Sequence, residues 1–171
     1  MIPIERILSG RDGRAWLQRL MIGRSGLVIQ VSLNIPGFPK NLGNDRILVE
    51  KTAKFLKLKA ISIGYSPLWT VLLDNGAGPA ELIEIQGGEG EPLKLMGMEM
   101  EDLTWGSILD IDVIGLRGAI HRKDVGGGDR KCMICDAPAK LCAREQRHDY
   151  GILRNRSALL VALGLEEMGE F

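Results

Sequence analysis

The sequence is poor in aromatic residues and has no excess of either charge. Phe, Trp and Tyr together make up 5% of its 171 residues, and 22 Lys and Arg balance 22 Asp and Glu. Single-stranded nucleic acid is usually bound by aromatic stacking, and duplexes or anionic membranes by a positive surface. No stretch approaches the roughly 18 apolar residues of a membrane-spanning helix. Neither a nucleic acid nor a membrane is therefore expected as a partner.

Cysteine is also scarce, with three in the chain, and the first residues, MIPIERILSGRDGR, contain no long apolar stretch. An odd number of cysteines without a secretory signal favours reduced thiols, so a cytoplasmic location is expected. Hydrophobic residues make up 45% of the chain, which is ordinary for a globular protein. A chain of this length can build one proper core, and we predict a single domain over residues 1–171.

Helical patterns occur near both ends of the chain and before its middle. The segment RDGRAWLQRLM predicts a short helix over residues 11–21, with Asp12 as its N-cap. Residues 44–60 place their apolar side chains on one face, as an amphipathic helix does. From about Pro138 onward the pattern again predicts helix, with this proline in the first turn.

Strand-like apolar runs fill the rest of the chain. The first covers residues 26–40 and is broken by Pro36 and Pro39, which cannot donate to a sheet. The others, separated by breakers such as NGAGP and GGEGEP, cover residues 60–65, 68–74, 80–86, 93–101 and 107–116. Strands in such close succession favour antiparallel pairing. The predicted fold is therefore α+β, a mostly antiparallel sheet with an N-terminal helix, one central helix and a C-terminal helix.

Two aspartates, Asp110 and Asp112, interrupt the apolar run GSILDIDVIG. Side chains alternate between the faces of a strand, so both carboxylates project from one face, roughly 7 Å apart between Cα atoms. Two anions at this spacing repel each other unless one is protonated or a cation lies between them. Mg²⁺ takes one or two carboxylates plus substrate phosphates. The pair predicts either a magnesium site or an ordinary solvated face of the sheet.

Several cations could bind phosphate groups, because arginine matches phosphate oxygens with two parallel hydrogen bonds. Arg122 and Arg130 bracket a glycine stretch, and the backbone N–H groups of such a loop can wrap phosphates. The other candidates are spread over the chain and are Arg11, Arg14, Lys40, Arg144 and His148. Taken singly, each is as easily explained as a solvated surface charge. If these cations lie close to a carboxylate pair, however, binding of phosphate explains them as well as a solvated surface does.

Three cysteines and a histidine have the spacing C-x2-C-x6-C-x5-H, and they are Cys132, Cys135, Cys142 and His148. This spacing is typical of a Cys₃His zinc knuckle. In one continuous helix, however, Cys142 and His148 would point about 240° apart around the axis. A zinc site therefore needs a break in the helix or another fourth ligand. The alternative is a set of buried thiols without a metal.

Together these motifs resemble the apo-citrate lyase phosphoribosyl-dephospho-CoA transferase family, the holo-acyl-carrier-protein synthases of citrate lyase. The similar stretches are, in chain order, GRDGRAWLQ, NIPGFPK, GSILDIDV and RKCMICDAPAKLCAREQRH. The last is the most specific, because it keeps the spacing C-x2-C-x6-C-x-R-x3-H. The resemblance covers most of the chain and is weakest over residues 45–95.

The resemblance implies a nucleotidyltransferase-like enzyme formed by one catalytic domain. Its substrate would be triphosphoribosyl-dephospho-CoA. The phosphoribosyl-dephospho-CoA part would pass to a serine of the acyl carrier protein of citrate lyase, and pyrophosphate would leave. In this interpretation Asp110 and Asp112 are the catalytic residues that hold Mg²⁺. The arginines, the lysine and the histidine named above would bind the substrate, mainly through its phosphates.

Two positions depart from the family pattern. Leu103 stands where a histidine is usual, and Ser107 stands where an arginine is usual. The loss of a phosphate-binding cation leaves open a divergent relative that modifies another carrier protein, or one without activity. A non-enzymatic module with a zinc knuckle or a nucleotide site is a further alternative.

Overall fold

The computed structural model describes residues 2–170. Its α-helices are α1 (Pro3–Ser25), α2 (Asp45–Ser62), α3 (Glu91–Glu101), α4 (Ala139–Glu145) and α5 (Tyr150–Glu167). Its strands are β1 (Gly26–Leu33), β2 (Ser66–Asn75), β3 (Gly78–Gln86), β4 (Leu109–Gly115) and β5 (Gly118–Ile120). Three short 3₁₀ turns are η1 (Gly106–Ile108), η2 (Arg122–Val125) and η3 (Met168–Glu170). Among the described residues, no helix is both long enough and apolar enough to span a bilayer.

The strands form one antiparallel sheet in the order β2-β3-β1-β4-β5. The α+β class and the antiparallel sheet are thus confirmed. Hairpin β2–β3 turns at Asn75–Gly78, within the predicted breaker NGAGP. Strand β1 lies at the centre, between β3 and β4. In the β1–β4 register, Ser32 is opposite Asp110 and Gln30 is opposite Asp112, so both aspartates adjoin the central strand.

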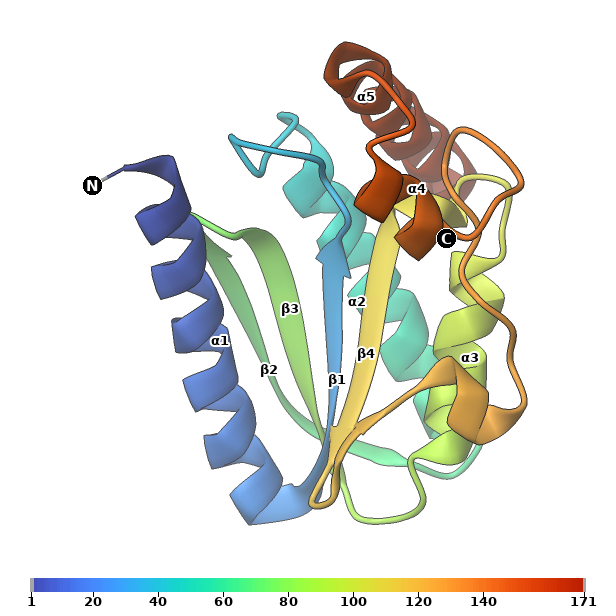
Figure 1. The fold of residues 1–171 in the computed structure, drawn as a ribbon. Helices are drawn as coiled ribbons and strands as arrows, with labels where there is room; N and C mark the ends of the chain where they lie inside the picture. Colours follow the sequence, from blue (N-terminus) through green and yellow to red (C-terminus); the bar gives the residue numbers. More distant parts are fainter. Residues whose placement is uncertain (1, 171) are drawn as a thin grey trace.

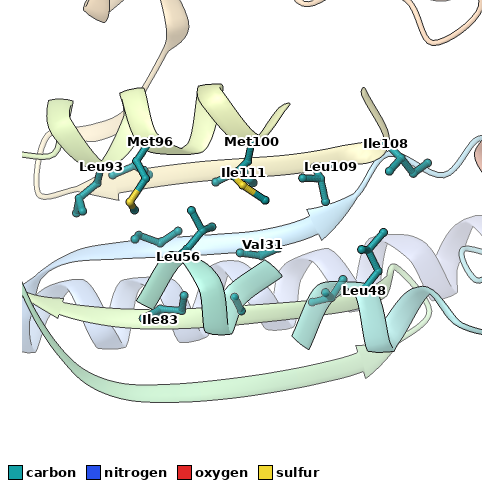
Figure 2. Packing of buried hydrophobic residues seen from close by; sticks show 14 of the residues in the cluster. Val31, Leu48, Leu56, Ile83, Leu93, Met96, Met100, Ile108, Leu109 and Ile111 are labelled. Atoms are coloured by element: carbon teal, nitrogen blue, oxygen red, sulfur yellow. The ribbon is translucent and has the colours of Figure 1, made fainter. Parts of the chain in front are cut away.

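Helices cover the two faces of the sheet unequally (Figure 1). On one face α1 packs mainly on β1 and β3, whereas α2 and α3 cover the other face. The main core lies under α2, α3 and α5, and Figure 2 shows side chains such as Leu56, Ile83 and Ile111 meeting there. A smaller cluster lies under α1. Because α1 does not extend fully over β4, that part of its face is available for a site.

Helix α3 corrects one prediction, because residues 93–101 are helical and the predicted strand is wrong. Pro92 lies in the first turn of the helix, where proline is tolerated, and Glu91 adds the acidic residue that favours a helix start. Buried Leu93, Met96 and Met100 recur at helical spacing. A short apolar run of this kind does not distinguish strand from helix by periodicity alone.

Other boundaries also differ from the predictions. Helix α1 begins at Pro3 instead of residue 11, so Asp12 lies inside the helix and is not its N-cap. The predicted strand over residues 60–65 is wrong, because these residues form the end of α2 and the turn after it. The central helix α2 is confirmed, and α3 adds a second one. The short strand β5 was not predicted.

The C-terminal helix is broken into α4 and α5. Helix α4 ends at Glu145, and Gln146 adopts a left-handed conformation with φ 48°. Helix α5 starts again after Asp149, whose carboxylate accepts the N–H groups of Gly151 and Ile152. A side-chain cap of this kind is a strong helix-start signal. The prediction of one helix from Pro138 onward is therefore wrong, and the break redirects the chain just before His148.

Candidate active site

The two aspartates lie on β4, on the sheet face that α1 leaves partly open. Buried and half-buried residues alternate along this strand, and the buried ones are Leu109, Ile111 and Val113. Asp110 and Asp112 project from the opposite face, as the alternation predicts. Their neighbours on the adjacent strand β1 are the polar residues Ser32 and Gln30. The carboxylates therefore stand on a polar floor formed by two central strands.

Two cavities adjoin these carboxylates, and Asp110 and Asp112 line both. The α1 cavity, of about 300 Å³, is walled by α1, by the end of β1 and by Lys40. The glycine-loop cavity, of about 590 Å³, is walled by α3, by the segment Gly127–Arg130 and by α4. Asn34, just after β1, lines both cavities as well. Groups could thus reach the carboxylates from two directions.

The outer edge of β4 is closed by two charged side chains from α3. Strand β5 pairs only with Val113–Gly115, so it leaves the backbone of Ile111 without a strand partner on that edge. The Lys94 ammonium donates to the Ile111 carbonyl oxygen at 2.7 Å, and Glu101 Oε1 accepts the Ile111 N–H at 2.8 Å. Both side chains are buried. They satisfy backbone groups that would be costly to bury unpaired, and they bring a cation and an anion beside Asp112.

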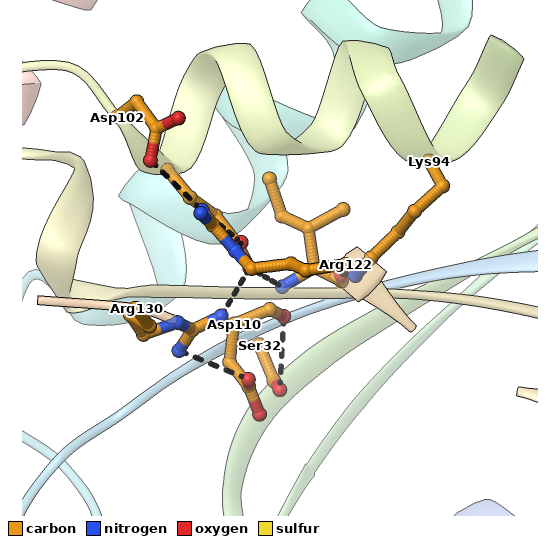
Figure 3. Close-up of polar contacts among 8 residues, drawn as sticks. Ser32, Lys94, Asp102, Asp110, Arg122 and Arg130 are labelled. Carbon is orange, nitrogen blue, oxygen red and sulfur yellow. Dashed lines mark hydrogen bonds and ion pairs between the residues drawn. The ribbon is translucent and has the colours of Figure 1, made fainter. Parts of the chain in front are cut away.

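Glu101 also gathers two of the predicted phosphate-binding arginines. Figure 3 shows Arg122 beside Asp102 and Arg130 beside Asp110. Arg122 donates to Glu101 Oε2 from Nε at 3.2 Å and from Nη2 at 2.9 Å, and it also contacts Asp102 at 2.9 Å. Arg130 pairs with Glu101 Oε1 and, at 3.3 Å, with Asp110 Oδ1. The structure therefore brings both arginines into the cavity that the aspartates line, and Arg130 contacts Asp110 directly. It also supplies carboxylates that neutralise both arginines.

The surroundings of Asp112 disfavour its charged form. It is half-buried and accepts no hydrogen bond from the residues that the structure describes. Burial first, and then the charge of Asp110, raises the pKa of Asp112 to about 6, although Lys94 and Arg130 act in the opposite direction. A divalent cation between the two carboxylates would remove this repulsion. The donor set therefore fits the predicted magnesium site.

The cations of the α1 cavity are not neutralised in the same way. Arg14 is only 8% exposed, and its Nη2 donates to the carbonyls of Ala77 and Gly78. Its buried Nε has no partner among residues 2–170. Lys40 donates to the Ile35 carbonyl. Burial, together with the charges of neighbouring arginines, lowers the pKa of both Arg14 and Lys40. Neither residue forms an ion pair within residues 2–170, so an anion entering this cavity would be stabilised.

Helix α5 fixes the loop that carries Lys40. Arg154 donates to the carbonyls of Pro36, Pro39 and Asn41, at 3.3, 2.6 and 3.1 Å. Gly37 has φ +64°, and a Cβ atom there would lie 2.2 Å from the ring of Tyr150. Only glycine meets both requirements. The motif NIPGFPK is therefore shaped by a contact with a helix more than 100 residues away in sequence.

The Cys/His segment forms a compact cluster beside this loop. The ligand atoms of its four residues, Cys132, Cys135, Cys142 and His148, all lie within 4.8 Å of one another. Cys135 Sγ lies 3.5 Å from Cys142 Sγ and 3.4 Å from His148 Nε2. The break between α4 and α5 turns His148 back toward Cys142, which removes the geometric objection posed by a continuous helix. These four residues could hold a metal ion.

The thiols of this cluster do not share the same protonation behaviour. Burial raises the pKa of Cys142 to about 11, and its contacts with Cys135 and Cys132 act in the same direction. Burial also acts to raise the pKa of Cys132, but the N–H groups of Ile134 and Cys135 and the neighbouring thiols hold it below its ordinary value. Three thiolates at this separation repel one another, and a divalent metal is what allows them to ionise together.

The remaining predicted residues lie elsewhere. Arg144 is exposed on α4 and does not line either cavity, and His148 belongs to the cysteine cluster. Ser107 lines an apolar cavity of about 550 Å³ beside Cys142, and Leu103 is exposed. Three residues beside the aspartates were not predicted, and they are Asn34, Lys94 and Glu101. The first was visible in NIPGFPK, whereas the other two were hidden by the strand prediction for α3.

Comparison with known proteins gives a consistent result. The family model described as apo-citrate lyase phosphoribosyl-dephospho-CoA transferase matches residues 2–162. The chain is 27% identical over 163 residues to a protein of that name from Escherichia coli O9:H4, covering 94% of this chain and 88% of the relative. It is 25% identical over 155 residues to a probable transferase of the same name from Vibrio cholerae serotype O1, covering 89% and 87%.

Proposed function

The chain belongs to the apo-citrate lyase phosphoribosyl-dephospho-CoA transferase family, and on that premise we propose how it attaches the prosthetic group of citrate lyase. The enzyme transfers phosphoribosyl-dephospho-CoA from triphosphoribosyl-dephospho-CoA to a serine of the acyl carrier protein. The observation that carries the mechanism is the carboxylate pair Asp110–Asp112 between two cavities that contain cations. The alternative of a non-enzymatic binding module has no support in the family match.

The reaction requires the carrier serine to attack the α-phosphate of the donor. A bond forms between serine Oγ and the α-phosphorus, and the bond from that phosphorus to the bridging oxygen of pyrophosphate breaks. Pyrophosphate leaves with the electron pair, and the hydroxyl proton is released to solvent. Negative charge shifts onto the leaving oxygens, so fixed positive charge is the main requirement of the site. The nucleophile belongs to the carrier, and no serine of this chain has to serve as one.

Mg²⁺ is the proposed metal of the aspartate pair. Bound by Asp110 and Asp112, it would neutralise charge on the phosphate oxygens. The raised pKa of Asp112 and the shared face of the two carboxylates support this assignment. Arg130, which pairs with Asp110 and Glu101, positions the first carboxylate. Lys94 holds a positive charge beside the second.

The test replaces each carboxylate by its isosteric amide. Asp110→Asn and Asp112→Asn should each lower the rate of carrier modification by about 100-fold or more, while circular dichroism shows an unchanged fold. Calorimetric titration with a non-hydrolysable donor analogue should show Mg²⁺-dependent binding that both variants lose. Asp12→Asn, an exposed position on α1, is the matched control. Full activity in both aspartate variants would disprove the metal role.

We also propose that the Cys/His cluster binds a structural Zn²⁺ ion. Around a tetrahedral zinc ion, sulfur and nitrogen ligands lie roughly 3.5–3.8 Å apart, close to the 3.5 and 3.4 Å separations of this cluster. Four protein ligands leave no open coordination position, which indicates a structural role. The hairpin that carries two of the cysteines closes with a hydrogen bond from the Ala139 N–H to the Arg130 carbonyl, so zinc would also fix Arg130.

The family match and the core support one further proposal, that residues 1–171 act as a single catalytic domain. One hydrophobic cluster joins residues of α2, α3, α5 and the central strands. We also propose that the enzyme acts in the cytoplasm, because none of its three cysteines, all within the described residues, is in a disulfide and cysteines stay reduced there.

A further inference from the structure

The two cavities lie on different sides of the aspartate pair. In Figure 1, α1 stands on the β1 side of β4, and the segment that follows β5 stands on the other side. The α1 cavity opens toward the helix and the glycine-loop cavity toward that segment. The residues common to both are Asn34, Asp110 and Asp112. A phosphate group held by the aspartates would therefore face one cavity on each side.

The two cavities differ in how their positive charge is compensated. In the α1 cavity, Arg11, Arg14 and Lys40 form no ion pair within the described residues, and the buried Nε of Arg14 lacks any partner. In the glycine-loop cavity, Arg122 and Arg130 are already paired with carboxylates. A desolvated cation without a partner is costly unless an anion joins it. The α1 cavity is therefore the one built to receive a highly charged anion.

The lysines of the glycine-loop cavity form no ion pair within residues 2–170, but they differ from the cations of the α1 cavity. Buried Lys94 is held by the Ile111 carbonyl, and its charge already acts on Asp112. Lys123 and Lys140 are exposed at its margin, on η2 and α4, and make no ion pair within residues 2–170. Exposed charges of this sort contribute little to binding a small buried group, but they steer and orient a protein partner of opposite charge. The glycines at 126–128 keep the margin free of bulky side chains.

We propose that pyrophosphate leaves into the α1 cavity and that the carrier serine arrives through the glycine-loop cavity. This assignment rests on the proposed function. In phosphoryl transfer the attacking and leaving oxygens are roughly in line, on opposite sides of the phosphorus. When the serine Oγ–phosphorus bond forms on one side, the phosphorus–pyrophosphate bond breaks on the other. The unpaired cations identify the leaving side, and the carrier therefore presents an acidic surface to Lys123 and Lys140.

The leaving side is tested with inorganic pyrophosphate and Mg²⁺, measured by calorimetry on the intact protein. Arg11→Met and Lys40→Met should each weaken pyrophosphate binding by about tenfold or more. Arg19→Met is the matched control, because Arg19 is exposed on the same helix and does not line the cavity. Thermal unfolding of each variant verifies that it is folded. Equal pyrophosphate affinity in wild type and both cavity variants would overturn the assignment.

The acceptor side is tested by steady-state kinetics with the acyl carrier protein as the varied substrate. Lys123→Glu and Lys140→Glu should raise KM for the carrier by about tenfold at low salt and leave pyrophosphate affinity unchanged. The reverse pattern, in which these variants lose pyrophosphate affinity and Arg11→Met does not, would refute the proposal. A protein that binds pyrophosphate through Arg11 and Lys40 but modifies no carrier would disprove the proposed function alone.

Discussion

Replacing Asp112 by asparagine should stabilise the metal-free protein while it abolishes catalysis. The pKa of Asp112 is raised from 3.8 to about 6, mainly by burial. The folded state therefore holds the proton more tightly than the unfolded state does. Between these two pKa values, stability falls as the pH rises, and above pH 6 the loss is complete. An amide at this position carries no charge to desolvate.

The size of the effect follows from the same pKa values. One pKa unit corresponds to about 1.4 kcal/mol. The raised pKa of Asp112 therefore limits the gain in unfolding free energy to about 3 kcal/mol at pH 7.5. Because Asp112 is only half-buried and its amide must still be solvated, we expect Asp112→Asn to gain about 1–3 kcal/mol in unfolding free energy. At pH 4.5 most of the folded protein already carries the proton, and the gain should shrink to about 1 kcal/mol or less.

Urea unfolding in EDTA at the two pH values measures this gain directly. Asp12→Asn is the control, because an exposed substitution should change stability by no more than about 0.5 kcal/mol. Saturating Mg²⁺ should reduce the difference between wild type and Asp112→Asn, because the cation stabilises the folded wild type. A variant that is less stable than the wild type at pH 7.5 in EDTA would refute the electrostatic account of this site.

Three further predictions concern the supporting structure. Glu101→Gln should destabilise the fold by about 2–4 kcal/mol, because it removes the buried negative charge that pairs with both Arg122 and Arg130. Glu99→Gln, at an exposed position of α3, is the control in the same urea unfolding experiment. Cys142→Ala should abolish stoichiometric zinc in elemental analysis, and removal of zinc from the wild type by a chelator should lower its Tm. A wild type that is purified without zinc, and whose Tm does not change when zinc is added, would contradict the zinc site. Gly37→Ala should cost about 1–3 kcal/mol and raise KM for the donor, since the Lys40 loop must move away from Tyr150; unchanged kinetics would show that the loop does not position Lys40.

Much of the site could be predicted because it depends on local chemistry. The alternation of Asp110 and Asp112 with apolar neighbours needs only the geometry of a strand, and the structure places both carboxylates on one face. The spacing of the cysteines and His148 likewise predicted either a zinc knuckle or buried thiols, and the break between α4 and α5 is what brings the four ligand atoms together. Strand β1, helix α2 and the hairpin turn at Asn75–Gly78 were equally readable from periodicity and turn residues.

The remainder was decided by contacts between segments distant in sequence. The apolar run over residues 93–101 fits either a strand or a helix, and its helical form is seen in how it packs against β4. This packing places Lys94 and Glu101 at the backbone of Ile111, on the free edge of that strand. The predicted cations could not be ranked from the sequence, because charge compensation depends on tertiary neighbours. Arg122 and Arg130 pair with carboxylates in the fold, whereas the buried Nε of Arg14 has no partner in the part of the chain that the structure describes. The sequence thus determined which chemical groups the protein has, and the tertiary structure decided which of them remain free to bind a substrate.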